Sequence, residues 1–330
     1  NTLSSSKILS SLKLKKTVHQ FFPIDTIYHT KKFLNYWKPT MAIFIDSEIW
    51  PNMIIYVKKK SIPLILLNAR ITKKSFSRWI KFILLAKRLF KNFDICFPSS
   101  LKSKKYLKLL GAKRIMFIGN LKFSQREKDE NYINTNIKND FLSKKIWCAS
   151  STHSTEEKYC GIVHKKLKTK YKNLLTIIIP RHIDRVDYIL DEMKTLGLKV
   201  QLEDSKKRIN KDTDIYLVNS YGKTKSFFKI CKTVFLGGSM VKHGGQNPIE
   251  AVKYGCKILH GRNIWNFEEI YKLLESYGSS KKVKNLNDLI HSVDNSFKSK
   301  NNSNKIKSKI EVLGNKILHS TLKELNFFLN

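Results

Sequence analysis

Acidic residues are scarce in this sequence. Its 330 residues include 26 Asp and Glu against 63 Lys and Arg, which gives a formal net charge of +37. A surplus of this sign predicts an anionic partner, such as nucleic acid, an acidic membrane surface or a phosphorylated substrate. Lysine is frequent along the whole chain, so a compositional bias spread over a solvated surface is an open alternative.

Long uncharged apolar runs are also missing. No stretch of about 18 uncharged apolar residues occurs, so the sequence predicts no transmembrane helix. The best apolar stretch, residues 79–90, is interrupted by Lys81, Lys87 and Arg88 and predicts an amphipathic helix with a basic face. We expect this helix to pack against the core, and contact with a membrane surface is the alternative.

The patterns that mark several common enzyme sites are absent. The dinucleotide pattern GxGxxG, the P-loop pattern GxxxxGK[ST], the nucleophile elbow GxSxG and the zinc motif HExxH do not occur, which counts against NAD, an NTPase, a serine triad and a metal. The five cysteines show no paired spacing, which predicts reduced core thiols of a cytoplasmic protein. We therefore expect neither a metal nor a cofactor.

Apolar strand-like segments alternate with helix-like segments along the chain. With 42% hydrophobic residues the chain can bury a sizeable core, and its length favours two domains. The alternation predicts an α/β protein with parallel sheets, whose ligands bind at the carboxyl ends of the strands. The polar residues 124–140 are interpreted as a link, which gives domains at 1–138 and 139–330. The expected strands include residues 41–45, 63–68, 94–97, 115–118, 146–150, 174–179, 215–218, 234–236 and 257–260.

A glycine-rich stretch is the most informative part of the second half. A short buried strand at residues 233–236 is followed by two glycine pairs and then by Asn247, Pro248 and Glu250, a capping-box pattern at a helix start. Strand, loop and helix together predict unpaired backbone N–H groups that can bind a phosphate or a carboxylate. An ordinary strand-to-helix turn is the alternative, but such a turn does not need four glycines.

Polar side chains collect at the expected strand ends of this half. The clusters lie at residues 150–153, 180–182, 237–245 and 247–250. Arg181 offers a fork of donors suited to phosphate or carboxylate. His243 either donates to an anion or is an ordinary loop histidine, and Glu250 either caps its own helix or accepts from ribose hydroxyls. The pattern favours a metal-free cleft for a nucleotide-linked anionic substrate.

Taken in order, these motifs resemble those of the 3-deoxy-D-manno-octulosonic acid (Kdo) transferases of lipopolysaccharide synthesis. The resemblance covers most of residues 19–270. The matching motifs are Asp46-Ser-Glu-Ile-Trp-Pro-Asn52, Leu67-Asn-Ala-Arg70 with Ser75-Phe76, Gly119-Asn-Leu-Lys122, Ala149-Ser-Ser-Thr-His153 with Glu156-Glu157, Pro180-Arg-His182, Gly237-Gly-Ser239 through His243-Gly-Gly-Gln-Asn-Pro-Ile-Glu250, and Asn266-Phe267.

The resemblance implies a GT-B glycosyltransferase with two Rossmann-like domains, an acceptor-side domain first and a CMP-sugar-binding domain second. It implies CMP-Kdo as donor, a lipid A precursor (lipid IVA) as acceptor, and inversion at the anomeric carbon without a metal or cofactor. It also implies work at the cytoplasmic face of the inner membrane, next to an anionic lipid surface, and no nucleic acid as partner.

The resemblance also implies roles for particular residues. Glu48 matches a glutamate beside a Trp-Pro pair and is the catalytic candidate; a structural role at a strand end is its alternative. The implied donor-binding residues are Pro180, Arg181, His182, Gly237, Gly238, Ser239, His243, Gly244, Asn247 and Glu250. Further candidates for the cleft are Ser47, Arg70, Asn120, Lys122, Ser151, Thr152, His153 and Asn266.

Two departures from the family pattern stand out. Members of the family begin with a membrane-anchoring helix and a Gly-Glu motif whose Glu is the proposed general base, and nothing here matches that region. The sequence is therefore interpreted as an N-terminally truncated copy with an incomplete first domain. In addition, Lys223 stands where the family usually has a glutamate, so this position receives no family role.

Three alternatives to a Kdo transferase are open. Another GT-B transferase that uses a UDP-sugar would prefer uracil to cytosine. A catalytically impaired fragment would bind nucleotide or anionic surfaces without turnover. A nucleic-acid-binding protein is suggested by charge alone, since no RNA- or DNA-binding motif and no aromatic-basic stripe occurs. The family includes members that add different numbers of Kdo units, and these motifs do not distinguish them.

Overall fold

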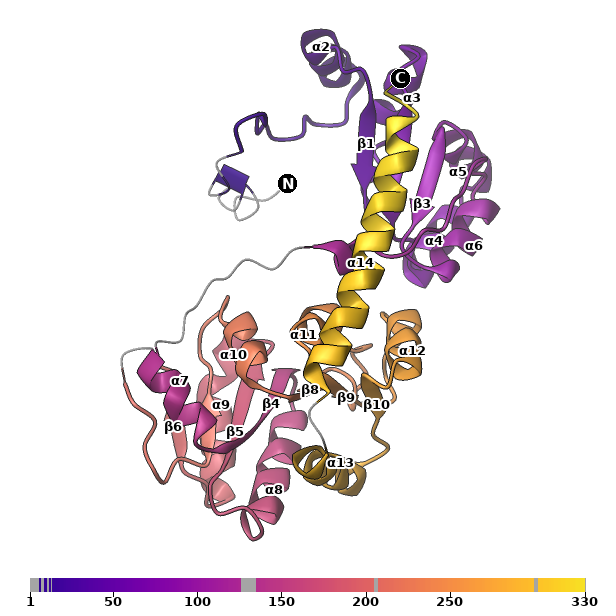
Figure 1. The fold of residues 1–330 in the computed structure, drawn as a ribbon. Helices are drawn as coiled ribbons and strands as arrows, with labels where there is room; N and C mark the ends of the chain where they lie inside the picture. The colour runs from indigo at the N-terminus through magenta and orange to yellow at the C-terminus, as the bar shows by residue number, and fades with distance from the viewer. Residues whose placement is uncertain are drawn as a thin grey trace. The chain divides into compact units, whose positions relative to one another are not determined.

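The protein forms two compact units in the computed structural model shown in Figure 1, which describes residues 6, 9, 10, 12, 14–125, 135–204, 207–299 and 302–329. The first unit comprises residues 1–121 and 319–330, and the second comprises residues 122–318. The expected boundary at residue 138 thus differs from the division in the structure, which falls at residues 121 and 122. Residues 126–134 of the expected link lie outside the described residues.

The last residues of the chain pack with the first unit, whereas the sequence placed them in the second domain. Leu325 and Phe328 contact the buried residues Ile65, Ile95 and Phe97. An ion pair adds to this contact, with Arg114 Nη2 and Glu324 Oε2 3.3 Å apart. Apolar contact with two strands therefore assigns this segment, a long-range interaction that no local pattern encodes.

The first unit is built on a parallel sheet in the order β1-β2-β3. Its elements are α2 (Ile27–Trp37), β1 (Ala42–Ile45), α3 (Pro51–Lys59), β2 (Leu64–Ala69), α4 (Lys73–Ile80), α5 (Ile83–Phe90), β3 (Ile95–Pro98) and α6 (Leu101–Leu109). The strand expected at residues 115–118 is wrong, because this segment makes only one isolated bridge, between Ile115 and Cys96. Its backbone hydrogen bonds to β3 stop after Met116 N donates to Cys96 O at 3.0 Å.

The apolar stretch at residues 79–90 is divided between two helices. Helix α4 ends at Ile80 and α5 begins at Ile83. Ala86, Leu89 and Phe90 are buried in the core, as expected for a core-facing helix. The opposite face of α5 and the preceding turn expose Phe82, Leu84 and Leu85. Among the described residues, no helix combines the length and apolar character needed to cross a bilayer.

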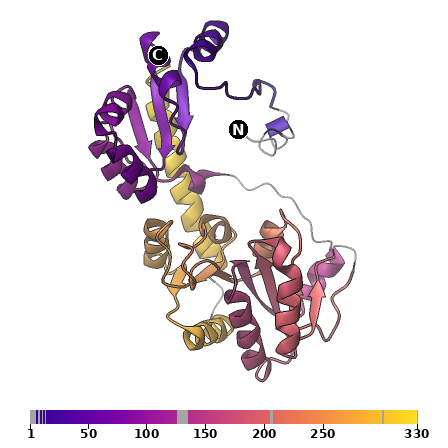
Figure 2. The same cartoon turned by 180° about the vertical axis from the view of Figure 1, so that it is seen from behind.

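The second unit contains a parallel sheet of seven strands in the order β10-β9-β8-β4-β5-β7-β6. Figure 2 shows this sheet from the side opposite to that of Figure 1. Its strands are β4 (Lys145–Thr152), β5 (Leu174–Pro180), β6 (Val200–Leu202), β7 (Ile215–Leu217), β8 (Thr233–Leu236), β9 (Lys257–His260) and β10 (Ser280–Lys282). Its helices are η1 (Leu121–Ser124), α7 (Thr135–Leu142), α8 (Glu156–Lys168), η2 (Ile183–Arg185), α9 (Val186–Thr195), α10 (Thr224–Ile230), α11 (Ile249–Lys253), α12 (Glu268–Ser276), α13 (Leu286–Lys298) and most of α14 (Ser303–Asn326).

The strand order reverses between β4 and β8. From β4 the chain proceeds to the adjacent β5, then to β6 at the edge of the sheet and back to β7 between them, and it then crosses to β8 on the other side of β4. In open parallel sheets, ligands bind outside the carboxyl ends of the strands at such a reversal. Cys148, Ala149 and Ser150 of β4 pair with residues 234–236 of β8, so the two strand ends lie side by side. The fold therefore places residues 150–153 next to residues 237–239.

The cysteines confirm the prediction of unpaired core thiols. All five are free and buried. Burial raises the pKa of the Cys96 thiol to about 12. The cysteines therefore pack as small apolar groups in the cores of both units.

Candidate functional site

The carboxyl ends of β4 and β8 approach each other so closely that residue 237 has to be glycine. Gly237 N donates to Ser150 O at 2.9 Å. A Cβ atom on residue 237 would lie 2.3 Å from Ser151 O and 2.5 Å from Thr152 Cα. Both of these are backbone atoms that cannot move aside without distorting β4. Gly237, which the family resemblance places in the donor site, is therefore also required for strand packing.

The second glycine pair is enclosed by the segment that precedes α12. Gly244 has φ of +88°, and a Cβ atom there would lie 2.3 Å from Asn266 Nδ2 and 2.6 Å from Trp265 Nε1. Asn266 Nδ2 donates to His243 O at 3.2 Å, and Asn266 N donates to Gly244 O at 3.1 Å. The structure thus brings the predicted residues His243, Gly244 and Asn266 together.

The carboxylate of Glu156 accepts hydrogen bonds from the start of the glycine loop, residues 238–240. Gly238 N donates to Glu156 Oε2 at 2.7 Å, while Ser239 N and Met240 N donate to Glu156 Oε1 at 3.1 and 2.9 Å. The expectation that unpaired backbone N–H groups await a ligand is wrong for these three residues. A side chain at least 82 positions away in the sequence accepts their hydrogen bonds, and capping patterns cannot reveal such a partner.

The helix after the loop begins one residue later than expected. Pro248 is the N-cap and α11 starts at Ile249, whereas the sequence pattern placed the N-cap at Asn247. Asn247 Oδ1 still accepts a hydrogen bond from Ile249 N at 3.2 Å. The Glu250 carboxylate lies 3.7 Å from Lys225 Nζ, and its side chain is 42% exposed. Glu250 therefore remains accessible to a ligand hydroxyl at the start of α11.

Three histidines and two arginines gather at the end of β4. The rings of His153 and His243 stack with centroids 4.2 Å apart and planes 14° from parallel, and the His182 ring lies 5.9 Å from His153. Arg181 N donates to Thr152 O at 3.0 Å, which places residues 180–182 beside residues 152 and 153. Burial, and after it the charges of His243, His182, Arg181 and Arg185, lower the pKa of His153 to about 4. This group of cationic and polar side chains suits a phosphate or a carboxylate.

Arg185 belongs to this group although the sequence did not point to it. Arg185 Nη1 and Nη2 donate to the two carboxylate oxygens of Glu157 at 2.9 and 3.4 Å. Glu157 is fully buried on the first turn of α8, and the Arg185 side chain is 22% exposed. The Glu156-Glu157 motif was the signal for this part of the site, since two adjacent buried carboxylates need two sets of donors.

The candidates in the first unit lie at the carboxyl ends of β1 and β2. Ser47 Oγ donates to Arg70 O at 2.7 Å, so these two predicted residues are neighbours. Glu48 Oε2 accepts a hydrogen bond from Trp50 Nε1 at 2.7 Å. Asn68, from the Leu67-Asn-Ala-Arg70 motif, has φ of +51°, and its side-chain oxygen accepts a hydrogen bond from Leu121 N at 3.1 Å. Asn120, beside Leu121, is thereby held near this strand end.

Lys122 falls in the second unit, while Asn120 falls in the first. The other predicted residues of the second unit lie around the ends of β4, β5 and β8: Ser151, Thr152, His153, Pro180, Arg181, His182, Gly237, Gly238 and Ser239. Among the described residues, no group of three or more His, Cys, Asp or Glu side chains is arranged to hold a metal ion.

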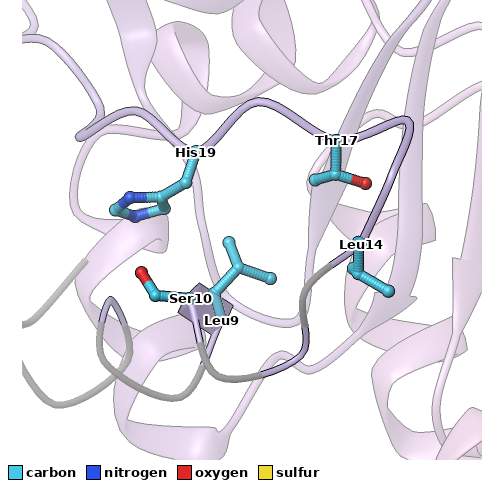
Figure 3. Close-up of a pocket in the computed structure, with 5 residues that line it drawn as sticks. All are labelled: Leu9, Ser10, Leu14, Thr17 and His19. Atoms are coloured by element: carbon cyan, nitrogen blue, oxygen red, sulfur yellow. The ribbon is translucent and has the colours of Figure 1, made fainter.

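A small pocket occurs elsewhere, in the N-terminal segment of the first unit. Figure 3 shows its lining residues, Leu9, Ser10, Leu14, Thr17 and His19. None of the residues predicted for donor binding lines it.

Two parallel-sheet units of this kind define a GT-B fold, the architecture of many nucleotide-sugar enzymes. The structure is similar to that of the UDP-GlcNAc 2-epimerase from Neisseria meningitidis bound to UDP-GlcNAc, with a TM-score of 0.61 and 16% sequence identity over 97% of this chain and 88% of that chain. At this identity the similarity establishes the fold alone.

Sequence comparison identifies the family. Residues 1–125 match the family model described as 3-deoxy-D-manno-octulosonic-acid transferase (kdotransferase). The transferase of that name from Rickettsia bellii is 32% identical over 298 residues, which cover 89% of this chain and 70% of the relative. The one from Rickettsia typhi is 33% identical over 310 residues, which cover 93% of this chain and 66% of the relative. The chain therefore belongs to the Kdo transferase family, and it spans just under two thirds of the Rickettsia typhi relative.

Proposed function

We propose that this protein transfers Kdo from CMP-Kdo to a lipid A precursor in lipopolysaccharide synthesis. The observation that carries the proposal is the group formed by the Arg181 cation and the rings of His153, His182 and His243 beside the glycine loop, at the switch point of a sheet in a Kdo transferase family member. CMP-Kdo carries a phosphate and a carboxylate, and both are anions that such side chains bind. The alternative transferase with a UDP-sugar donor is separated by the base of the nucleotide.

The donor site would use side chains more than backbone N–H groups. Gly238 and Ser239 already donate their amides to Glu156, so they would shape the site without binding the phosphate through nitrogen. Arg181 and the histidines supply donors at the same place, and we assign the anionic groups of the donor to them. Glu250 at the start of α11 would accept hydrogen bonds from ribose hydroxyls, with Asn247 and Pro180 beside the nucleoside.

The chemical step would need no metal or cofactor. The acceptor hydroxyl oxygen attacks the anomeric carbon of Kdo from the face opposite to CMP, which inverts the configuration. The bond from that carbon to the phosphate oxygen breaks, and CMP leaves with the electron pair. Arg181 would stabilise the charge that develops on the phosphate. The proton of the acceptor hydroxyl passes to a carboxylate base, and Glu48 is the candidate among the described residues.

Titration calorimetry with CMP and UMP tests the donor assignment. We expect the protein to bind CMP, to bind UMP at least tenfold more weakly, and to lose at least about tenfold in CMP affinity on Glu250→Ala, because hydrogen bonds to a charged group contribute about 1.5–3 kcal/mol. Glu311→Ala is the matched control, since Glu311 is a 62% exposed glutamate on α14. Equal affinity for both nucleotides, or binding that Glu250→Ala leaves unchanged, would contradict the proposed site.

We further propose that helices α4 and α5 contact an anionic membrane surface, the cytoplasmic face of the inner membrane. Phe82, Leu84 and Leu85 are 66%, 76% and 52% exposed, and residues 71–93 contain no acidic residue. Exposed basic side chains surround these apolar ones: Lys73, Lys74, Arg78, Lys81, Lys87 and Arg88. Apolar side chains that enter the headgroup region and cations that meet anionic lipid headgroups reinforce each other.

Sedimentation with lipid vesicles tests this surface. We expect the protein to bind vesicles that contain phosphatidylglycerol and to bind pure phosphatidylcholine vesicles at least tenfold more weakly. The double variant Phe82→Ser/Leu84→Ser should lose about tenfold or more in affinity for these vesicles. Full transfer of one large apolar side chain out of water contributes about 1.5–3 kcal/mol. Val312→Ser on α14, where Val312 is 66% exposed, is the control. Full binding by the double variant would exclude this face as the contact.

A further inference from the structure

A fully buried carboxylate lies under the proposed donor site. Glu156, on the first turn of α8, is 0% exposed. Its Oε2 accepts hydrogen bonds from His153 N at 3.0 Å and Gly238 N at 2.7 Å. Its Oε1 accepts from Ser239 N at 3.1 Å and Met240 N at 2.9 Å. Each oxygen therefore has two backbone donors, and all of them belong to segments that carry the site.

This geometry requires the ionised carboxylate. An ionised carboxylate only accepts hydrogen bonds, whereas a protonated one would direct its O–H at an N–H donor. Burial raises the pKa of the Glu156 carboxyl group above its ordinary value, and the hydrogen bonds from the backbone N–H groups oppose that shift. The glycine loop thus resembles a phosphate-binding loop in which a side chain of the protein occupies the position of the anion.

The same carboxylate fixes the backbone on both sides of the histidine stack. It holds His153 directly, and it holds residues 238–240, which lead to His243. The far side of the loop is held separately, since Asn263 N donates to Ser239 O at 2.8 Å and Asn266 Nδ2 donates to His243 O at 3.2 Å. The stack of His153 on His243 therefore depends on a loop in which residues 238–240 are all held by the Glu156 carboxylate.

We propose that Glu156 is a positioning residue of the donor site, which fixes His153 and residues 238–240 so that His243 stacks on His153 where an anionic group of the donor binds. This inference rests on the proposed function for its ligand. It also explains the role of the glycine loop. The N–H groups of residues 238–240 donate to the Glu156 carboxylate, so the anionic groups of the donor are bound by side chains.

The variant Glu156→Gln tests the proposal, because it keeps the shape of the side chain but directs an NH₂ group at two N–H donors. We expect amide hydrogen exchange at Gly238, Ser239 and Met240 to become at least 100-fold faster. In a histidine titration by NMR, the pKa of His153 should rise from about 4 towards its ordinary value of about 6.5, because the burial and the neighbouring charges that lower it disperse. CMP affinity should fall at least tenfold.

Glu157→Gln is the matched control. Glu157 is equally buried and adjacent in the sequence, but its carboxylate pairs with Arg185. In this variant, exchange at the loop amides should accelerate no more than exchange at the β4 amides of residues 148–150, whereas Glu156→Gln should accelerate the loop amides beyond those of β4. Where Glu156→Gln fails to fold, Glu156→Asp replaces it, since an acid shorter by one carbon–carbon bond of about 1.5 Å keeps the charge and cannot reach all four donors.

The outcomes separate this inference from the proposed function. Unchanged loop exchange and an unchanged His153 titration in the Glu156 variants would overturn the positioning role. A loosened loop with unchanged CMP affinity would also overturn it, because Glu156 would then hold the loop without serving the donor site. If the parent protein binds no CMP, the proposed function fails, while the exchange and titration measurements still decide whether Glu156 positions the histidine stack.

Discussion

Replacing Gly237 by alanine is expected to lower the free energy of unfolding of the second unit by about 3 kcal/mol or more and to abolish CMP binding. The new Cβ atom would lie 2.3 Å from Ser151 O and 2.5 Å from Thr152 Cα. Overpacking a tight interior costs about 1–3 kcal/mol and occasionally more, and here the atoms that must move are backbone of the central strand β4. The displaced residues 151 and 152 lead directly to His153.

Native-state hydrogen exchange of the β4 amides at residues 148–150 measures this loss, because these amides report the opening of the second unit. Gly197→Ala is the control. Gly197 also belongs to the second unit and has φ of +72°, but a Cβ atom added there would meet no other atom within 4 Å. Only the strain of a left-handed alanine applies there, about 1–2 kcal/mol. Equal losses at both positions would show that strand contact is not the reason for glycine at 237.

Replacing Arg185 by methionine is expected to cost about 3 kcal/mol of unfolding free energy. Glu157 is 0% exposed and the Arg185 guanidinium pairs with both of its oxygens. Removing one partner of a buried ion pair leaves an uncompensated charge, which typically costs about 3–5 kcal/mol. Part of Arg185 is solvent-accessible, so the expected value lies at the lower end of that range.

The double variant Arg185→Met/Glu157→Leu provides the decisive comparison. Replacing both partners by apolar groups of similar size removes the unpaired charge, so the double variant should recover at least about 1.5 kcal/mol relative to Arg185→Met. Exchange of the same β4 amides serves as the measurement. A single variant that loses less than about 1 kcal/mol would show that water reaches Glu157 and replaces the guanidinium.

The sequence by itself determined the family and most of the secondary structure. The strands expected at residues 41–45, 63–68, 94–97, 146–150 and 174–179 are present within two residues of their expected ends. Short β-branched and apolar runs that alternate with helical segments identify buried parallel strands, because a strand covered on both faces needs apolar residues on both. The order of the short motifs identified the Kdo transferase family, and that assignment needed no coordinates.

Only the tertiary structure decided where the ends of segments pack and which groups satisfy the loop. Residues 115–118 have the composition of a strand but make one bridge, and the last residues of the chain pack on β2 and β3 in the first unit. The capping pattern at Asn247 predicted a helix start to within one residue. It could not show that Glu156 accepts the N–H groups of the glycine loop, because that contact joins residues 82 or more positions apart. Local sequence patterns encode local backbone preferences. The acceptor for a buried N–H group depends instead on which strands and helices pack next to each other in the folded protein.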